Sequence, residues 1–91
     1  MSDTFQSDTT QAPPPAPVIV DLRPMIPPQR HATVFAAIEG LAPGASFVLI
    51  NDHAPVPLLR RMEEIWPGLY DFQYLSDGPE VWQVAITRRS A

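Results

Sequence analysis

Proline constrains this chain more than any other residue, because it occupies 12 of the 91 positions. Proline lacks the amide donor that a helix interior or a central strand requires, so each proline marks an entrance, an end or a turn. Residues 1–17 hold four prolines together with many Ser, Thr and Gln. Such a segment buries too little apolar surface to offset its ordering entropy. We therefore expect residues 1–17 to be a disordered Pro-rich tail and residues 18–91 to form a single small domain.

Charge and composition exclude several classes of function. The formal net charge is −4, and all six basic residues are arginine, which argues against a nucleic-acid partner. The chain has no cysteine, so it has no thiolate nucleophile, persulfide carrier, disulfide or Cys-bound cluster. No stretch approaches the ~18 apolar residues of a membrane span, and the N-terminus lacks the basic and apolar regions of a signal peptide. These features predict a soluble, cytoplasmic protein with no membrane contact.

Prolines and glycines divide the chain into six segments. Within each segment, the apolar residues recur at the spacing of either a strand or a helix. Four are predicted strands, at residues 18–22, 46–51, 69–75 and 81–87. Two are predicted helices, one from Pro27 to a cap at Gly40 and one from an entrance at Pro55 to Pro67. In this βαβαββ order, right-handed crossovers place both helices on one face of the sheet. The sequence thus predicts an α+β fold, a two-layer sandwich of a four-stranded mixed sheet and two helices.

The second predicted helix has one apolar stripe and one charged face. Its stripe is predicted to consist of the apolar residues Leu58, Leu59, Met62, Ile65 and Trp66. Its solvent-exposed face is predicted to carry Arg60, Arg61, Glu63 and Glu64. The stripe is expected to pack on the sheet.

Residues 21–28, at the first strand-to-helix junction, resemble a signature of the TusA/SirA-like family of small sulfur-carrier proteins. That signature is Asp-x-Arg-Gly-Leu-x-Cys-Pro-x-Pro. Asp21, Arg23 and Pro28 match it, Pro24 and Met25 replace the Gly and Leu, and Pro27 replaces the carrier Cys. The resemblance implies a sheet order of 1-2-4-3. Because proline has no nucleophilic atom, persulfide carriage does not follow from it.

Three other motifs look like those of the cysteine-less, uncharacterised relatives in that family: Arg30-His31, Asn51-Asp52-His53-x-Pro and Glu80-Val81-Trp82. Such domains occur alone or joined to hemerythrin-like domains. The resemblance therefore implies hemerythrin-like or redox proteins as partners.

Polar residues gather where the first two strands end. The C-terminal ends of parallel strands share one edge of a sheet, beside the N-termini of the following helices. We call this set the polar edge; it comprises Asp21, Arg23, His31, Asn51, Asp52 and His53. Free helix amides would suit a small anionic ligand there. His31, Asp52 and His53 together also suit a divalent metal such as zinc or non-haem iron, although nothing in the sequence requires a cofactor.

Structural roles are the alternatives for the same residues. His31 lies in the apolar stripe of its helix and could serve packing there. Asn51 and Asp52 precede a helix and could cap its first amides. Asp21 and Arg23 could simply pair with each other. His53 has no apolar partner at helical spacing, so we expect it to be the most exposed and the best functional candidate.

Three functions remain open. The first is a non-catalytic module that binds a partner protein or ligand through the polar edge or through the uncovered face of the sheet. The second is a metal- or redox-linked protein that uses His31, Asp52 and His53. The third is a docking protein in sulfur trafficking that lacks the carrier cysteine. An enzyme is disfavoured, because no serine lies in a glycine-rich elbow or near a histidine in sequence, and the four glycines never take the spacing of a phosphate loop.

Overall fold

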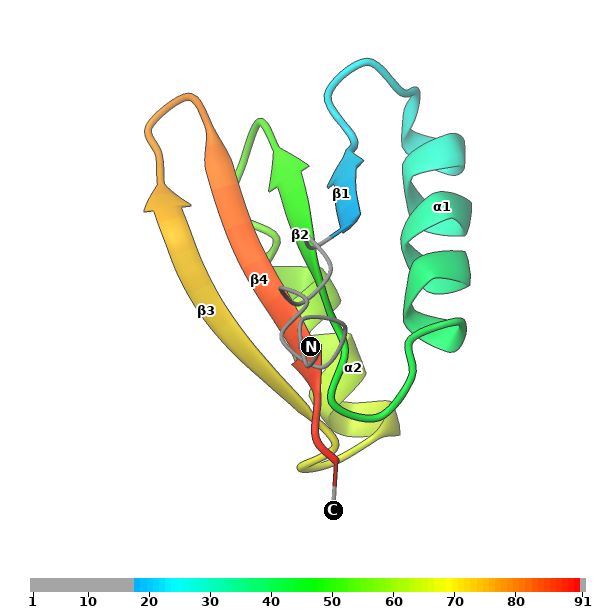
Figure 1. The fold of residues 1–91 in the computed structure, drawn as a ribbon. Helices are drawn as coiled ribbons and strands as arrows, with labels where there is room; N and C mark the ends of the chain where they lie inside the picture. Colours follow the sequence, from blue (N-terminus) through cyan, green and yellow to red (C-terminus); the bar gives the residue numbers. More distant parts are fainter. Residues whose placement is uncertain (1–17, 91) are drawn as a thin grey trace, which may run out of the picture.

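The computed structural model describes residues 18–90, so the tail predicted for residues 1–17 lies outside the described residues. The elements are β1 (Val18–Asp21), α1 (Pro27–Glu39), β2 (Ser46–Asn51), α2 (Val56–Ile65), β3 (Tyr70–Asp77) and β4 (Trp82–Arg88). The strands form one sheet in the order β1-β2-β4-β3 (Figure 1). β1 and β2 are parallel, and the other two pairings are antiparallel. The predicted α+β fold and its sheet order are confirmed.

The core lies between one face of the sheet and the two helices. Leu49 and Val84 face each other across β2 and β4, and both are fully buried. Ile38 of α1 and Met62 of α2 belong to the same buried cluster, which places both helices over this face. Alternate side chains of the strands point to the other face, which neither of the two helices in residues 18–90 covers. Figure 1 is viewed from that uncovered face, with α2 behind the sheet.

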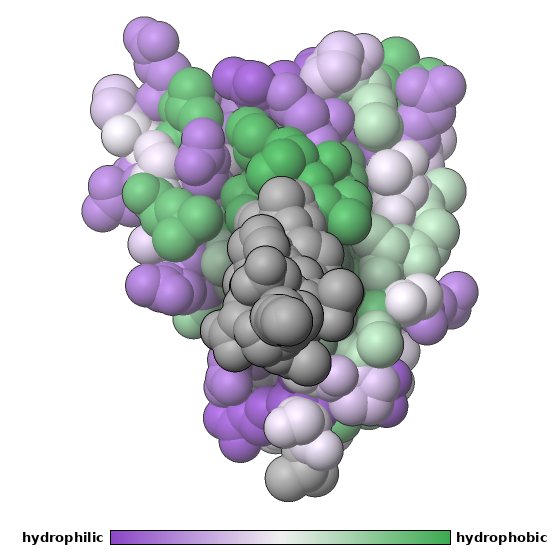
Figure 2. Space-filling view, viewed as in Figure 1, coloured by the Kyte–Doolittle hydropathy of each residue, from purple (hydrophilic) through white to green (hydrophobic). Residues whose placement is uncertain are grey.

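The uncovered face carries an apolar row across three strands. Ile19, Val48 and Ala85 are paired neighbours in β1, β2 and β4, and the Ile19 side chain is 55% exposed. Figure 2 shows hydrophobic surface gathered on the upper part of this face, with hydrophilic surface along the upper edge of the view. Within residues 18–90, no helix is long and apolar enough to cross a membrane.

The hairpin between β3 and β4 is longer than its sequence pattern predicts. Both strands begin one residue later than predicted. β3 also ends two residues later, at Asp77, which pairs with Trp82 at the end of the ladder. Gly78 forms the turn with φ +91°, and its N–H donates to the Val81 carbonyl at 3.0 Å. The Ser76 hydroxyl donates to the same carbonyl at 2.9 Å. These two bonds to the Val81 carbonyl hold the end of the hairpin together past residue 75, where the predicted strand ends.

Helix α2 covers the core with a narrower stripe than predicted. Met62 is its only buried residue, and Leu59 and Trp66 pack beside it against the core. Ile65 is 44% exposed, so its predicted place in the buried stripe is wrong. Leu58 also packs against the core, so the buried side of α2 follows residues 58, 59, 62 and 66. Ile65 and Arg61 lie at the margin of this side, where they line the space between the two helices.

Candidate functional site

Arg30, in the first turns of α1, joins the two loops that form the polar edge. Its Nε donates to the Met25 carbonyl at 2.8 Å, and its Nη2 donates to the Arg23 carbonyl at 3.3 Å. Its Nη1 donates to Asn51 Oδ1 at 3.0 Å, and Nη1 and Nη2 each donate to one carboxylate oxygen of Asp52 at 3.1 Å. These bonds engage all five N–H donors of a guanidinium group. Arg30 therefore fixes the chain after β1 against the end of β2.

His53 is oriented by its two preceding neighbours. Its Nδ1 lies 2.8 Å from Asp52 Oδ1, and its Nε2 lies 3.5 Å from Asn51 Nδ2. Since Asn51 Oδ1 accepts from Arg30, the Asn51 amide nitrogen faces the imidazole. This network favours the tautomer in which Nδ1–H donates to Asp52 and Nε2 is an acceptor. The His53 side chain is 67% exposed, so this oriented ring is available at the surface.

The same network sets the acidity of Asp52. The Arg30 guanidinium, followed by His53, lowers the pKa of the Asp52 carboxyl from its usual 3.8 to about 2. Hydrogen bonds to a carboxylate favour its charged form. Asp52 is therefore an anion at every pH at which the protein is expected to work, and it serves as the acceptor that holds both Arg30 and His53.

Asp21 and Arg23 form a separate pair at the end of β1. Arg23 Nε and Nη2 donate to the two carboxylate oxygens at 2.9 and 2.7 Å, and the Arg23 backbone N–H donates to Asp21 Oδ1 at 3.1 Å. The side-chain bond from Arg23 lowers the pKa of Asp21, and the pairing raises the pKa of Arg23. The pairing expected as a structural role is confirmed.

The capping role expected for Asn51 and Asp52 is wrong. Neither helix has a side-chain hydrogen bond at its N-cap, and the cap of α2 is Pro55. Arg30 instead draws both side chains toward α1. Proline also occupies the first turn of each helix, which removes amide donors that an anion would use. The helix N-termini are therefore weak anion sites.

His31 and His53 border the same hollow of about 250 Å³, together with Arg30 and Asn51. His31 is exposed, and its ring packs on Phe35 of the next turn with a centroid separation of 4.6 Å. Across residues 18–90, no three His, Cys, Asp or Glu side chains come together in a group that could hold a metal ion. The fold thus brings the two histidines to one hollow without gathering His31, Asp52 and His53 around a common point.

Sequence reasoning gave Arg30 no role of its own. Its partners lie 21 and 22 residues away in the sequence, so no local spacing reveals the contact. Two signals were nonetheless present: Arg30 stands beside the candidate His31, and it lies one turn into a helix that begins at the same edge of the sheet.

A family model matches most of the chain. The model of a family described as "Uncharacterized conserved protein (DUF2249)" matches residues 19–88. No curated protein and no solved structure matches the chain significantly.

Proposed function

The chain belongs to the DUF2249 family of uncharacterised conserved proteins, and we propose that it is a non-catalytic module that binds a partner protein through the polar edge. The observation that carries this proposal is the Arg30 network, which holds Asp52 and the exposed His53 in one arrangement before any partner arrives. Side chains that are already ordered lose less entropy on binding. The polar edge thus has the preorganisation that recognition requires.

Exposed apolar residues lie beside these polar groups. Ile26 is the N-cap of α1 and is 59% exposed, and Val56 begins α2 and is 44% exposed. Both residues stand at the edge where β1 and β2 end, because both helices start there. Protein interfaces combine apolar anchors with oriented polar groups in this way. The binding mode that we propose is an apolar contact at Ile26 and Val56, with a donor of the partner replacing the 3.5 Å contact of Asn51 Nδ2 at His53 Nε2.

The hollow beside His53 supports a role in binding rather than in catalysis. The Asp52–His53 contact has the form of an oriented general base, but a base needs a nucleophile or a substrate proton within reach. None of the described residues that line this hollow is a serine, threonine, cysteine or acid. The residues that line the hollow can therefore form hydrogen bonds and apolar contacts with a partner.

Two other functions have one supporting observation each. A relation to TusA-like carriers, with a docking role in sulfur trafficking, is supported by the Asp21–Arg23 pair at the junction where those carriers have their signature. A metal- or redox-linked function is supported by the position of His31 and His53 on one hollow. We rank both below partner binding, because Pro27 replaces the carrier cysteine and the metal-binding side chains do not converge.

The test is site-specific photocrosslinking in cells that contain the native partners. A photoreactive residue at Ile26 samples the polar edge, and one at Glu39, the exposed last residue of α1, is the matched control at the other end of the same helix. We expect a discrete crosslinked product only from position 26. His53→Ala should abolish that product, while Arg60→Ala should leave it unchanged. A product that forms equally at position 39, or that survives His53→Ala, would refute the proposed surface.

A further inference from the structure

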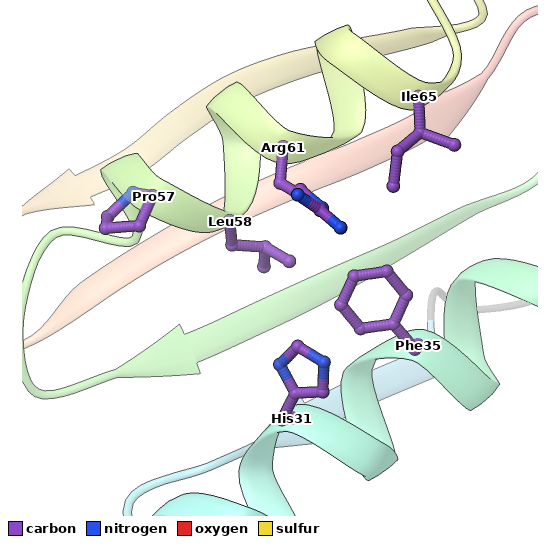
Figure 3. Close-up of a pocket in the computed structure, with 6 residues that line it drawn as sticks. All are labelled: His31, Phe35, Pro57, Leu58, Arg61 and Ile65. Atoms are coloured by element: carbon purple, nitrogen blue, oxygen red, sulfur yellow. The ribbon is translucent and has the colours of Figure 1, made fainter.

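A groove of about 380 Å³ lies between the two helices, on the layer that covers the sheet. Figure 3 shows its six lining residues, with His31 and Phe35 on α1 facing α2. From α2 come Pro57, Leu58, Arg61 and Ile65. The volume lies within the usual range of small-molecule sites, about 300–1,000 Å³. The groove is therefore large enough for a small organic ligand.

The walls of the groove are largely apolar, and two of their residues, Phe35 and Ile65, are not part of the core. The flank of α2 that packs on the sheet carries Leu59 and Met62, which leaves Ile65 on the neighbouring flank 44% exposed. Across the groove, Phe35 is half-buried and its ring stacks with that of His31. Figure 3 shows the Phe35 ring directed toward α2, opposite Ile65. A flat apolar group would have Phe35 on one side and Ile65 on the other.

Arg61 gives the groove a charge without a counterion. Among residues 18–90, the Arg61 guanidinium has no hydrogen bond and no ion pair, whereas Arg23, Arg30 and Arg89 are each paired with an aspartate. Figure 3 shows the Arg61 side chain extending from α2 toward α1, between Leu58 and Ile65. The lining includes no acidic residue, although the whole chain has a net charge of −4. The groove is thus a cationic site on an acidic protein.

From this arrangement we infer that the inter-helix groove binds a small aromatic carboxylate. The ligand's carboxylate accepts two hydrogen bonds from the Arg61 guanidinium, which matches the planar geometry of a carboxylate. Its ring lies against Phe35 and Ile65, and the His31 ring extends the aromatic surface. A phosphate or a nucleotide is disfavoured, because these ligands need several donors and the described lining offers only Arg61 and the imidazole of His31. This site adjoins the polar edge proposed for partner binding and shares His31 with it.

The test uses the full chain with 3-phenylpropionate as the probe and 3-phenylpropionamide as its neutral counterpart. Amide NMR spectra and calorimetry should show saturable binding of the acid, with the largest shifts at His31, Phe35 and Arg61. Arg61→Gln keeps a polar side chain but removes the guanidinium and its charge, and it should weaken binding about tenfold. Arg60→Gln is the matched control, since Arg60 is its exposed neighbour outside the groove, and it should change affinity less than about twofold.

Four outcomes would overturn the inference. One is the absence of saturable shifts at the groove up to about 10 mM acid. Another is equal binding of the neutral amide, which would exclude the role of Arg61. A third is equal weakening by both arginine variants, which would indicate unspecific charge attraction. The fourth is tighter binding of an N-acetylated peptide ending in phenylalanine, because the groove would then accept a protein segment.

Discussion

Arg30 and Asp52 are joined by two parallel hydrogen bonds, from Nη1 to Oδ1 and from Nη2 to Oδ2, each 3.1 Å long. The pair links the start of α1 to the residue that follows β2. The remaining donors of Arg30 reach two backbone carbonyls and Asn51, so the side chain acts on both loops at once. In this way one residue outside the core determines the shape of the polar edge.

Arg30→Ala should destabilise the fold by about 2 kcal/mol, because Asn51 Oδ1 and the carbonyls of Arg23 and Met25 would lose their donor. Urea unfolding followed by circular dichroism measures the change. Arg60→Ala is the control, since Arg60 is exposed and has no such contacts within residues 18–90; we expect it to change stability by less than about 0.5 kcal/mol. Equal effects of the two variants would show that the network around Arg30 contributes nothing to folding.

The stability contributed by Asp52 should depend on pH. Its pKa in the folded protein, about 2, lies below its usual 3.8, so its stabilisation is complete above about pH 4 and is lost as the pH falls toward 2. Comparison of wild type with Asp52→Asn by thermal unfolding across this range tests the linkage. Wild type should be the more stable protein at pH 7, and the difference should narrow below pH 4. A difference that stays constant from pH 7 to pH 2 would contradict the pairing with Arg30.

The fold was predictable because prolines and glycines lie near several of the element boundaries, such as Gly40 after α1 and Gly78 after β3. Pro27 and Pro67 bound helical segments, and Gly78 lies in the turn between the antiparallel strands β3 and β4. The spacing of apolar residues along the sequence could not show which of them on α2 face the core. Residues 58, 59, 62, 65 and 66 are all apolar, and a stripe that wide is compatible with more than one orientation. Leu58 both packs against the core and lines the groove, whereas Ile65 only lines the groove, and spacing along the helix does not distinguish the two.

The candidate site was predictable by location but not by contact. The strand order places Asp21, Asn51 and His53 at one edge, and spacing alone suggested a short-range pair for Asp21. The role of Arg30 depends on two loops that meet only after folding, so the sequence offers no spacing for it. The roles of Arg61 and Ile65 were missed for a similar reason, because the groove exists only where the two helices face each other.

Zinc should not bind His31 and His53 together. The two imidazoles border one hollow, yet no group of three metal-binding side chains forms within the described residues. Histidine side-chain NMR during a zinc titration is the measurement, with His31→Ala and His53→Ala to assign the signals. We expect separate, weak responses at high metal concentration, since a zinc site of useful affinity needs about three protein ligands. A joint response at low micromolar zinc would instead establish the metal-linked function.

Gly78 should tolerate alanine less well than Gly68 does. Both glycines have positive φ, +91° and +73°, so alanine is strained at either position by about 1 kcal/mol. At Gly78 a Cβ would also lie 2.5 Å from Cζ2 of Trp82, whereas at Gly68 it would have nothing within 4 Å. Gly78→Ala should therefore destabilise the protein by about 3 kcal/mol in total, because the indole must move out of its place against the turn. Urea unfolding of the two variants isolates the effect of the indole, and tryptophan fluorescence of the folded Gly78→Ala protein should change while that of Gly68→Ala does not. Equal destabilisation with unchanged fluorescence in both variants would show that Trp82 does not pack on the turn.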